Sequence, residues 1–112
     1  MESFAKEADS AEAFYKDGIA FFEKKDFENA YSYFRISGDV KNYAPAQNML
    51  GVCYRDGLGI ARNLKEAEKY FKLAAEQGNT DAEANLAELA NDKEKLYRDG
   101  TALFLKKKSE EA

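Results

Sequence analysis

Apolar residues recur at steps of three and four positions along most of the chain, which is the spacing of a helical stripe. One stripe passes through Phe14, Phe21 and Phe22, and another through Tyr70 and Phe71. A half-buried strand would instead alternate apolar and polar residues. The pattern therefore predicts helices over residues 10–24, 27–38, 45–56, 64–77, 80–90 and 92–108.

Capping residues support these boundaries. A side chain of the N-cap type is followed three positions later by glutamate at Asp9/Glu12, Asn63/Glu66, Thr80/Glu83 and Asn91/Glu94. Gly38, Gly57 and Gly78 are placed where a left-handed residue would end a helix. We expect short connections, and therefore antiparallel helix pairs.

The pairs repeat along the chain. Gly18, an aromatic residue, an alanine and Phe34 recur as Gly51, Tyr54, Ala67 and Phe71, and a third copy begins near Ala82. Three tandem copies are typical of a repeat architecture. We predict one all-α domain over residues 1–112, an α-solenoid of about three antiparallel helix pairs, with repeats near 10–43, 44–79 and 80–108.

Small residues lie in the middle of the first helix of each pair, at Gly18, Gly51 and Ala87. Glycine costs about 1 kcal/mol relative to alanine in an exposed helix. Its presence in two such helices indicates that a neighbouring helix approaches the backbone closely.

The central copy resembles a Sel-one-like repeat over residues 44–90, and the first copy resembles a tetratricopeptide repeat because its turn at residues 23–26 is shorter. This resemblance implies a right-handed superhelix whose concave face, lined by the first helix of each pair, takes up peptides or partner domains. It also implies roles as scaffolds, chaperones and adaptors. The residues that carry it are Ala46, Leu50, Gly51, Tyr54, Gly57, Gly59, Ala67, Tyr70, Ala74, Ala75, Gly78, Ala82 and Leu86.

Composition excludes several other classes of protein. Hydrophobic residues make up 45% and charged residues 34% of the 112, so the chain can bury a core. The net charge of -4 argues against nucleic-acid binding, which needs a concentrated basic face. The basic run 106–108 is followed at once by Glu110 and Glu111, and we interpret it as a solvated helix end.

The chain offers few groups for catalysis. It contains no histidine, so the commonest general base and metal ligand is missing, and its single cysteine, Cys53, is interpreted as a buried packing residue. We predict no enzyme activity, no cofactor and no metal site. The N-terminus lacks the pattern of a secretory signal and no apolar segment reaches the ~20 residues that span a bilayer, so we expect a cytoplasmic protein without a membrane contact.

Residues off the core stripe of the first helices are the candidate partner-binding residues. They are Tyr15, Ile19 and Phe22 in the first pair, Asn48, Val52 and Arg55 in the second, and Ala84, Glu88 and Asn91 in the third. Two interpretations of Tyr15, Ile19, Phe22 and Val52 carry equal weight. They form an exposed apolar patch for a partner, or they pack under neighbouring helices.

These observations predict a protein-protein interaction module, an adaptor, scaffold or chaperone-like protein that binds a peptide or another protein on the concave face. The alternative is an inhibitor or immunity protein that caps a partner enzyme. Self-association is a further hypothesis, because the terminal helix with Leu96, Leu103 and Phe104 could pair with a second copy.

Overall fold

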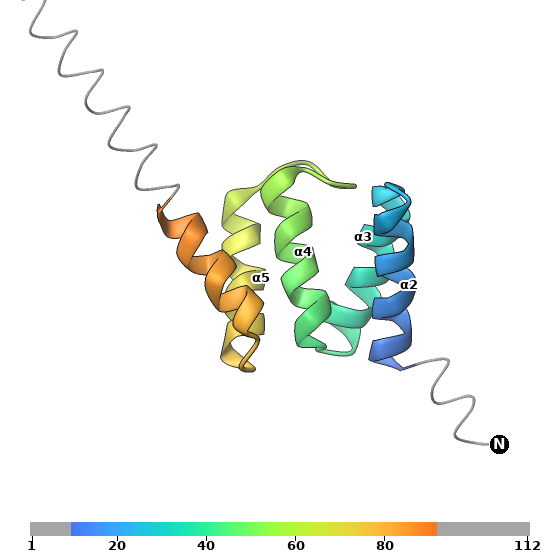
Figure 1. Cartoon of the computed structure of the whole chain (residues 1–112), viewed down its shortest axis with the longest axis horizontal. Helices are drawn as coiled ribbons and strands as arrows, with labels where there is room; N and C mark the ends of the chain where they lie inside the picture. Colours follow the sequence, from blue (N-terminus) through green and yellow to red (C-terminus); the bar gives the residue numbers. More distant parts are fainter. Residues whose placement is uncertain (1–9, 92–112) are drawn as a thin grey trace, which may run out of the picture.

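The computed structural model describes residues 10–91, and within this range it contains helices and turns but no strand (Figure 1). The predicted helix 92–108 and the terminal-helix homodimer lie outside the described residues. The observed bounds match the predicted ones closely, except that the second helix passes into a short π-helix. The elements are α2 (Ala11–Glu23), α3 (Phe27–Arg35), the π-helix η1 (Ile36–Val40), α4 (Ala44–Asp56), α5 (Leu64–Glu76) and a helix over residues 80–91.

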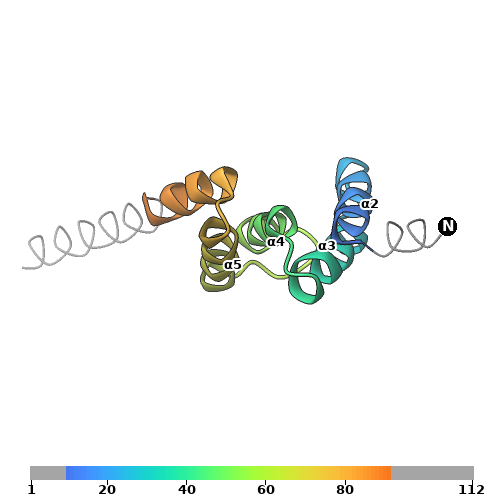
Figure 2. The same ribbon diagram turned by 90° about the horizontal axis from the view of Figure 1, so that it is seen from below.

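Consecutive helices run antiparallel, and α2 packs against α3 as α4 packs against α5. Contacts between α3 and α4 join the two pairs. Figure 2 shows α2, α4 and the helix 80–91 on one side, which we call the first-helix face, and α3 and α5 on the other, the second-helix face. The all-α solenoid is confirmed in the described part of the chain.

Helix starts follow the capping rule but not always at the predicted residue. Asn63 accepts hydrogen bonds from the backbone N–H groups of residues 65 and 66, both at 3.1 Å, as predicted. At α2 the cap is Ser10, whose Oγ accepts from Ala13 N at 3.1 Å, and Asp9 lies outside the described residues. The prediction of Thr80 was wrong. Thr80 already belongs to the first turn, so Asn79 caps that helix through Ala82 N at 2.8 Å.

Two of the three predicted glycine exits are confirmed. Gly57 and Gly78 have φ angles of 70° and 87°, which favour glycine. Gly38 was predicted wrongly, because it lies inside η1 and Asn42, with φ 55°, makes the turn after it. A Cβ at Gly38 would lie 2.9 Å from Leu50 Cδ1. Glycine is needed there for close packing and not for a left-handed backbone.

The mid-helix glycines confirm the predicted close approach. A Cβ added at Gly18 would lie 2.6 Å from Cε1 of Phe34, and one added at Gly51 would overlap the ring of Phe71. Each repeat therefore seats a buried phenylalanine of its second helix on a glycine of its first. Ala87 differs, since it is exposed and the helix expected to cover it lies outside the described residues.

Buried residues form two clusters, each of which joins residues of two successive repeats. Cys53 belongs to the first and is fully buried, and burial raises the pKa of its thiol to about 12. The thiol is therefore protonated at neutral pH and acts as a packing group. The core consists of Ala30, Phe34, Ala46, Leu50, Cys53, Ala67, Tyr70, Phe71, Ala74, Ala82 and Leu89.

Three tyrosines connect the repeats. The hydroxyls of Tyr31 on α3 and Tyr54 on α4 are 2.8 Å apart, and the ring of Tyr54 stacks on that of Tyr70 with centroids 5.7 Å apart. The Tyr70 hydroxyl donates to Asp39 Oδ2 at 3.1 Å. Burial, and then the hydrogen bond to Asp39, raises the pKa of Tyr70 above its ordinary value. Burial and the contact with Tyr54 raise the pKa of Tyr31 as well.

These pKa shifts predict a loss of stability in alkaline solution. A phenol whose pKa is higher in the folded state contributes its full stability below the unfolded pKa of about 10 and loses it as the pH rises further. For Tyr70, which is 6% exposed, the expected loss is about 1.4 kcal/mol per pH unit above that value. Urea unfolding at increasing pH measures it. The Tyr70→Phe variant should show a shallower slope, and equal slopes would contradict this assignment.

Candidate partner-binding face

The first-helix face brings together side chains from three helices. Tyr15 on α2 meets Tyr43, just before α4, edge to face with ring centroids 5.7 Å apart. Burial raises the pKa of Tyr15, and the charges of Tyr43 and of Asp81 add to the shift. Asp81 lies on the helix 80–91, so a charge on the third repeat affects the Tyr15 hydroxyl on the first.

The apolar candidate residues are half-buried. Ile19 and Phe22 pack with Tyr15 against the cluster around Phe34, and Val52 packs against the cluster around Phe71. Of the two interpretations made from the sequence, packing under neighbouring helices describes their main contacts, and each keeps part of its surface exposed. An apolar side chain fixed in this way adds contact area with little loss of conformational entropy.

Polar side chains connect α4 to the helix 80–91. Asn48 is largely buried, and its Oδ1 accepts a hydrogen bond from Asn85 Nδ2 at 2.9 Å. Asn85 Oδ1 in turn accepts from Arg55 Nη1 at 3.4 Å. Sequence reasoning chose Ala84 and missed Asn85. The signal available was spacing, since Asp81, Asn85 and Glu88 recur at helical steps.

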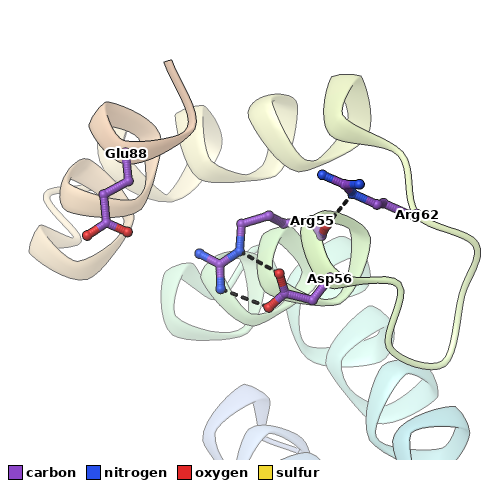
Figure 3. Close-up of a pocket in the computed structure, with 4 residues that line it drawn as sticks. All are labelled: Arg55, Asp56, Arg62 and Glu88. Atoms are coloured by element: carbon purple, nitrogen blue, oxygen red, sulfur yellow. Dashed lines mark hydrogen bonds and ion pairs between the residues drawn. The ribbon is translucent and has the colours of Figure 1, made fainter. Parts of the chain in front are cut away.

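The polar contacts border a hollow of about 440 Å³, lined by Arg55, Asp56, Arg62 and Glu88 (Figure 3). The Arg55 guanidinium donates two hydrogen bonds to the Asp56 carboxylate, at 3.0 and 2.9 Å, and lies 6.0 Å above the Phe71 ring centroid. Arg62 Nε donates to the backbone oxygen of Arg55 at 3.0 Å. Glu88 lies across the hollow from the two arginines.

The arrangement suits recognition. Two guanidinium groups and two carboxylates face one space, and such groups form charge-assisted hydrogen bonds with the charged side chains and backbone of a polypeptide. Within residues 10–91 no cluster of His, Cys, Asp and Glu has the geometry of a metal site. Over the same range, no helix combines the length and apolar character that crossing a bilayer requires.

Comparison with known proteins agrees with the fold. The Sel1 repeat family model matches residues 9–39 and 44–79. The first of these matches shows that the copy with the shorter turn, which resembles a tetratricopeptide repeat, also fits the Sel1 pattern. The crystal structure of a Sel1 repeat protein from Oxalobacter formigenes superposes with a TM-score of 0.69 and 30% sequence identity, covering 73% of this chain and 35% of that one.

Curated relatives contain the same repeat within much longer chains. DAP3-binding cell death enhancer 1 of Rattus norvegicus is 35% identical over 76 residues, which are 66% of this chain and 15% of the relative. Protein sel-1 homolog 2 of Mus musculus is 36% identical over 53 residues, which are 47% of this chain and 8% of the relative. This chain thus spans a small part of the relatives it matches. With its two matched repeats and its shared fold, the chain belongs to the Sel1 repeat family.

Proposed function

We propose that this chain is an adaptor or scaffold that binds a peptide or partner protein on its first-helix face. Sel1 repeats are generally protein-protein interaction modules. The single observation that carries the placement is the charged hollow between α4 and the helix 80–91. One relative is named as DAP3-binding, and this supports a binding role for the present chain in general terms.

Arg55 is the centre of the proposed site. Its guanidinium is held by Asp56, by Asn85 and by its position over Phe71, so its geometry is set before a partner arrives. Arginine and aromatic residues are enriched at the energetic centres of protein interfaces, and fixed side chains lose less entropy on binding. The largely buried Asn48 fixes Asn85 through a hydrogen bond, and Asn85 in turn accepts from Arg55.

The outer residues of the hollow determine which charged groups of a partner it would favour. Arg62 and Glu88 are both exposed and carry opposite charges. A partner that places a carboxylate near Arg62 and a cation near Glu88 gains charge-assisted hydrogen bonds at both positions. The half-buried apolar residues Tyr15, Ile19 and Phe22 extend the contact surface along α2.

The test is a charge exchange that leaves the net charge unchanged. In the double variant Arg62→Glu with Glu88→Lys, we expect retention of the specific partner from a lysate of the encoding organism to fall about tenfold, as read by quantitative mass spectrometry. The identity of the retained protein separates an adaptor from an inhibitor of an enzyme.

The matched control exchanges charges outside the hollow. Glu23 and Lys24 are exposed at the end of α2, and Glu23→Lys with Lys24→Glu should retain the partner as the native chain does. Circular dichroism checks that both variants keep their helices. Equal retention by all three proteins would reject the first-helix face as the site.

A further inference from the structure

The large apolar side chains that are exposed within residues 10–91 lie on η1, which continues α3, and on α5. Ile36 and Val40 on η1 are 36% and 73% exposed, and Leu73 on α5 is 37% exposed. Single exposed apolar residues are ordinary, whereas a group of them on one face often marks an interaction site. The charged hollow, in contrast, is lined by residues of α4 and the helix 80–91, on the first-helix face, together with Arg62.

The π-helix accounts for two of these exposed side chains. In η1 the backbone N–H of Lys41 bonds to the oxygen of Ile36 at 3.2 Å, a wider turn than that of an α-helix. Ser37 points the other way and donates from its Oγ to the backbone oxygen of Ala11 at 2.6 Å. The hydrogen bond of Ser37 thus anchors the buried side of η1, and Ile36 and Val40 face outward into solvent. Short π-helical turns occur frequently at functional sites.

Two hollows contain these exposed residues. The first has a volume of about 370 Å³ and includes Ile36, Asp39 and Val40, and the second has about 460 Å³ and runs along α5 to Leu73. Tyr70 connects them, because its hydroxyl bonds to Asp39 and the Lys69 ammonium lies 5.5 Å from its ring centroid. The two hollows are thus linked through Tyr70, although η1 and α5 are distant in sequence.

The charge of this neighbourhood is opposite in sign to that of the chain. The whole protein carries -4. The charged residues that line the two hollows are four cations, Arg35, Lys65, Lys69 and Lys72, and two anions, Asp39 and Glu68. Three of the cations form ion pairs, Arg35 with Asp39, Lys69 with Glu66 and Lys72 with Glu68, so one net positive charge is left. The six residues Ile36, Val40, Lys65, Lys69, Lys72 and Leu73 are called the second-helix patch.

We propose that the second-helix patch is a second docking surface, which binds an acidic amphipathic segment of a partner protein. Apolar side chains of the segment enter the two hollows, and its carboxylates meet the lysines of α5. The hollows favour a protein over an anionic membrane. Ile36 and Leu73 keep about a third of their surface exposed in the walls of the hollows, which a protruding partner side chain enters more readily than the flat surface of a bilayer does.

The experiment uses the full chain, labelled with ¹⁵N, and a short synthetic amphipathic peptide of leucine and glutamate as the probe. We expect the peptide to shift the amide signals of η1 and of α5 around residues 65–73. The same peptide with lysine in place of glutamate should not bind, since its charge repels the patch. Vesicles containing phosphatidylserine should not bind either.

Two pairs of variants complete the test. The double variant Val40→Asp with Leu73→Asp should bind the acidic peptide about tenfold or more weakly. Both side chains are exposed, and the new negative charges repel those of the peptide. Arg62→Glu with Glu88→Lys, on the other face, should leave this binding unchanged. The proposal is overturned by shifts confined to α2 and α4, by binding of vesicles in place of the peptide, or by equal affinity in the Asp variant. Vesicle binding, or equal affinity in the Asp variant, would leave the proposed site on the first-helix face unaffected.

Discussion

Replacing Phe71 by alanine is expected to lower the free energy of unfolding by about 3–5 kcal/mol. Its side chain is fully buried and its ring rests directly on the backbone of Gly51, so its removal leaves a cavity in the core. The ring also supports Arg55 on the first-helix face. Urea unfolding followed by circular dichroism measures the loss.

Leu73→Ala on the same helix is the matched control. Leu73 is 37% exposed, so its removal should cost less than about 1 kcal/mol. A similar loss in both variants would show that Phe71 is not the packing centre of the second repeat.

The glycine beneath the ring offers an independent check of the same contact. Gly51→Ala adds a methyl group that overlaps the Phe71 ring, and overpacking of this kind costs about 1–3 kcal/mol. Phe71→Leu removes the ring atoms that this methyl group would overlap. The double variant should therefore lose less free energy of unfolding than the sum of the losses in the two single variants. Strict additivity would contradict a direct contact between these positions.

Replacing Gln47 by methionine is expected to cost about 2–4 kcal/mol. Gln47 is 3% exposed, and its Nε2 donates to the backbone oxygen of Gly38 at 3.1 Å and to Asn42 Oδ1 at 2.8 Å. Its Oε1 accepts from Gln77 Nε2 at 2.7 Å. Methionine keeps the volume but leaves the buried carbonyl of Gly38 without its side-chain donor, and buried groups without partners are costly.

The control for this prediction is Gln77→Ala. Gln77 is exposed and contributes one of the three hydrogen bonds, so its loss should cost about 1 kcal/mol or less. Thermal and urea unfolding of both variants would decide the matter. Equal small losses would mean that Gln47 does not hold the end of α5 against the turn after η1.

Much of the fold follows from local pattern. The spacing of aromatic residues places the helices, and the recurrence of Gly18 and Phe34 as Gly51 and Phe71 anticipates the close contact between the helices of each repeat. These features are visible in the sequence because each depends on residues within one repeat. Capping at Asn63 is local in the same way.

Other features depend on contacts between repeats, and the sequence does not display them. The π-helix forms where Ser37 reaches the start of α2 and Gly38 lies against Leu50, so no short window contains its cause. The pairing of Asn48 with Asn85 depends on the rotation of the helix 80–91 about its axis. The predicted apolar residues on α2 and α4 proved half-buried for the same reason, since only packing decides which side of an apolar stripe remains open.

The most direct test of the central claim is an NMR titration of the ¹⁵N-labelled chain with the partner identified by affinity capture. Binding on the first-helix face predicts amide shifts on α2, on α4 around Asn48 and Arg55, and on the helix 80–91 around Asn85 and Glu88. Shifts confined to α3, η1 and α5 would contradict the account.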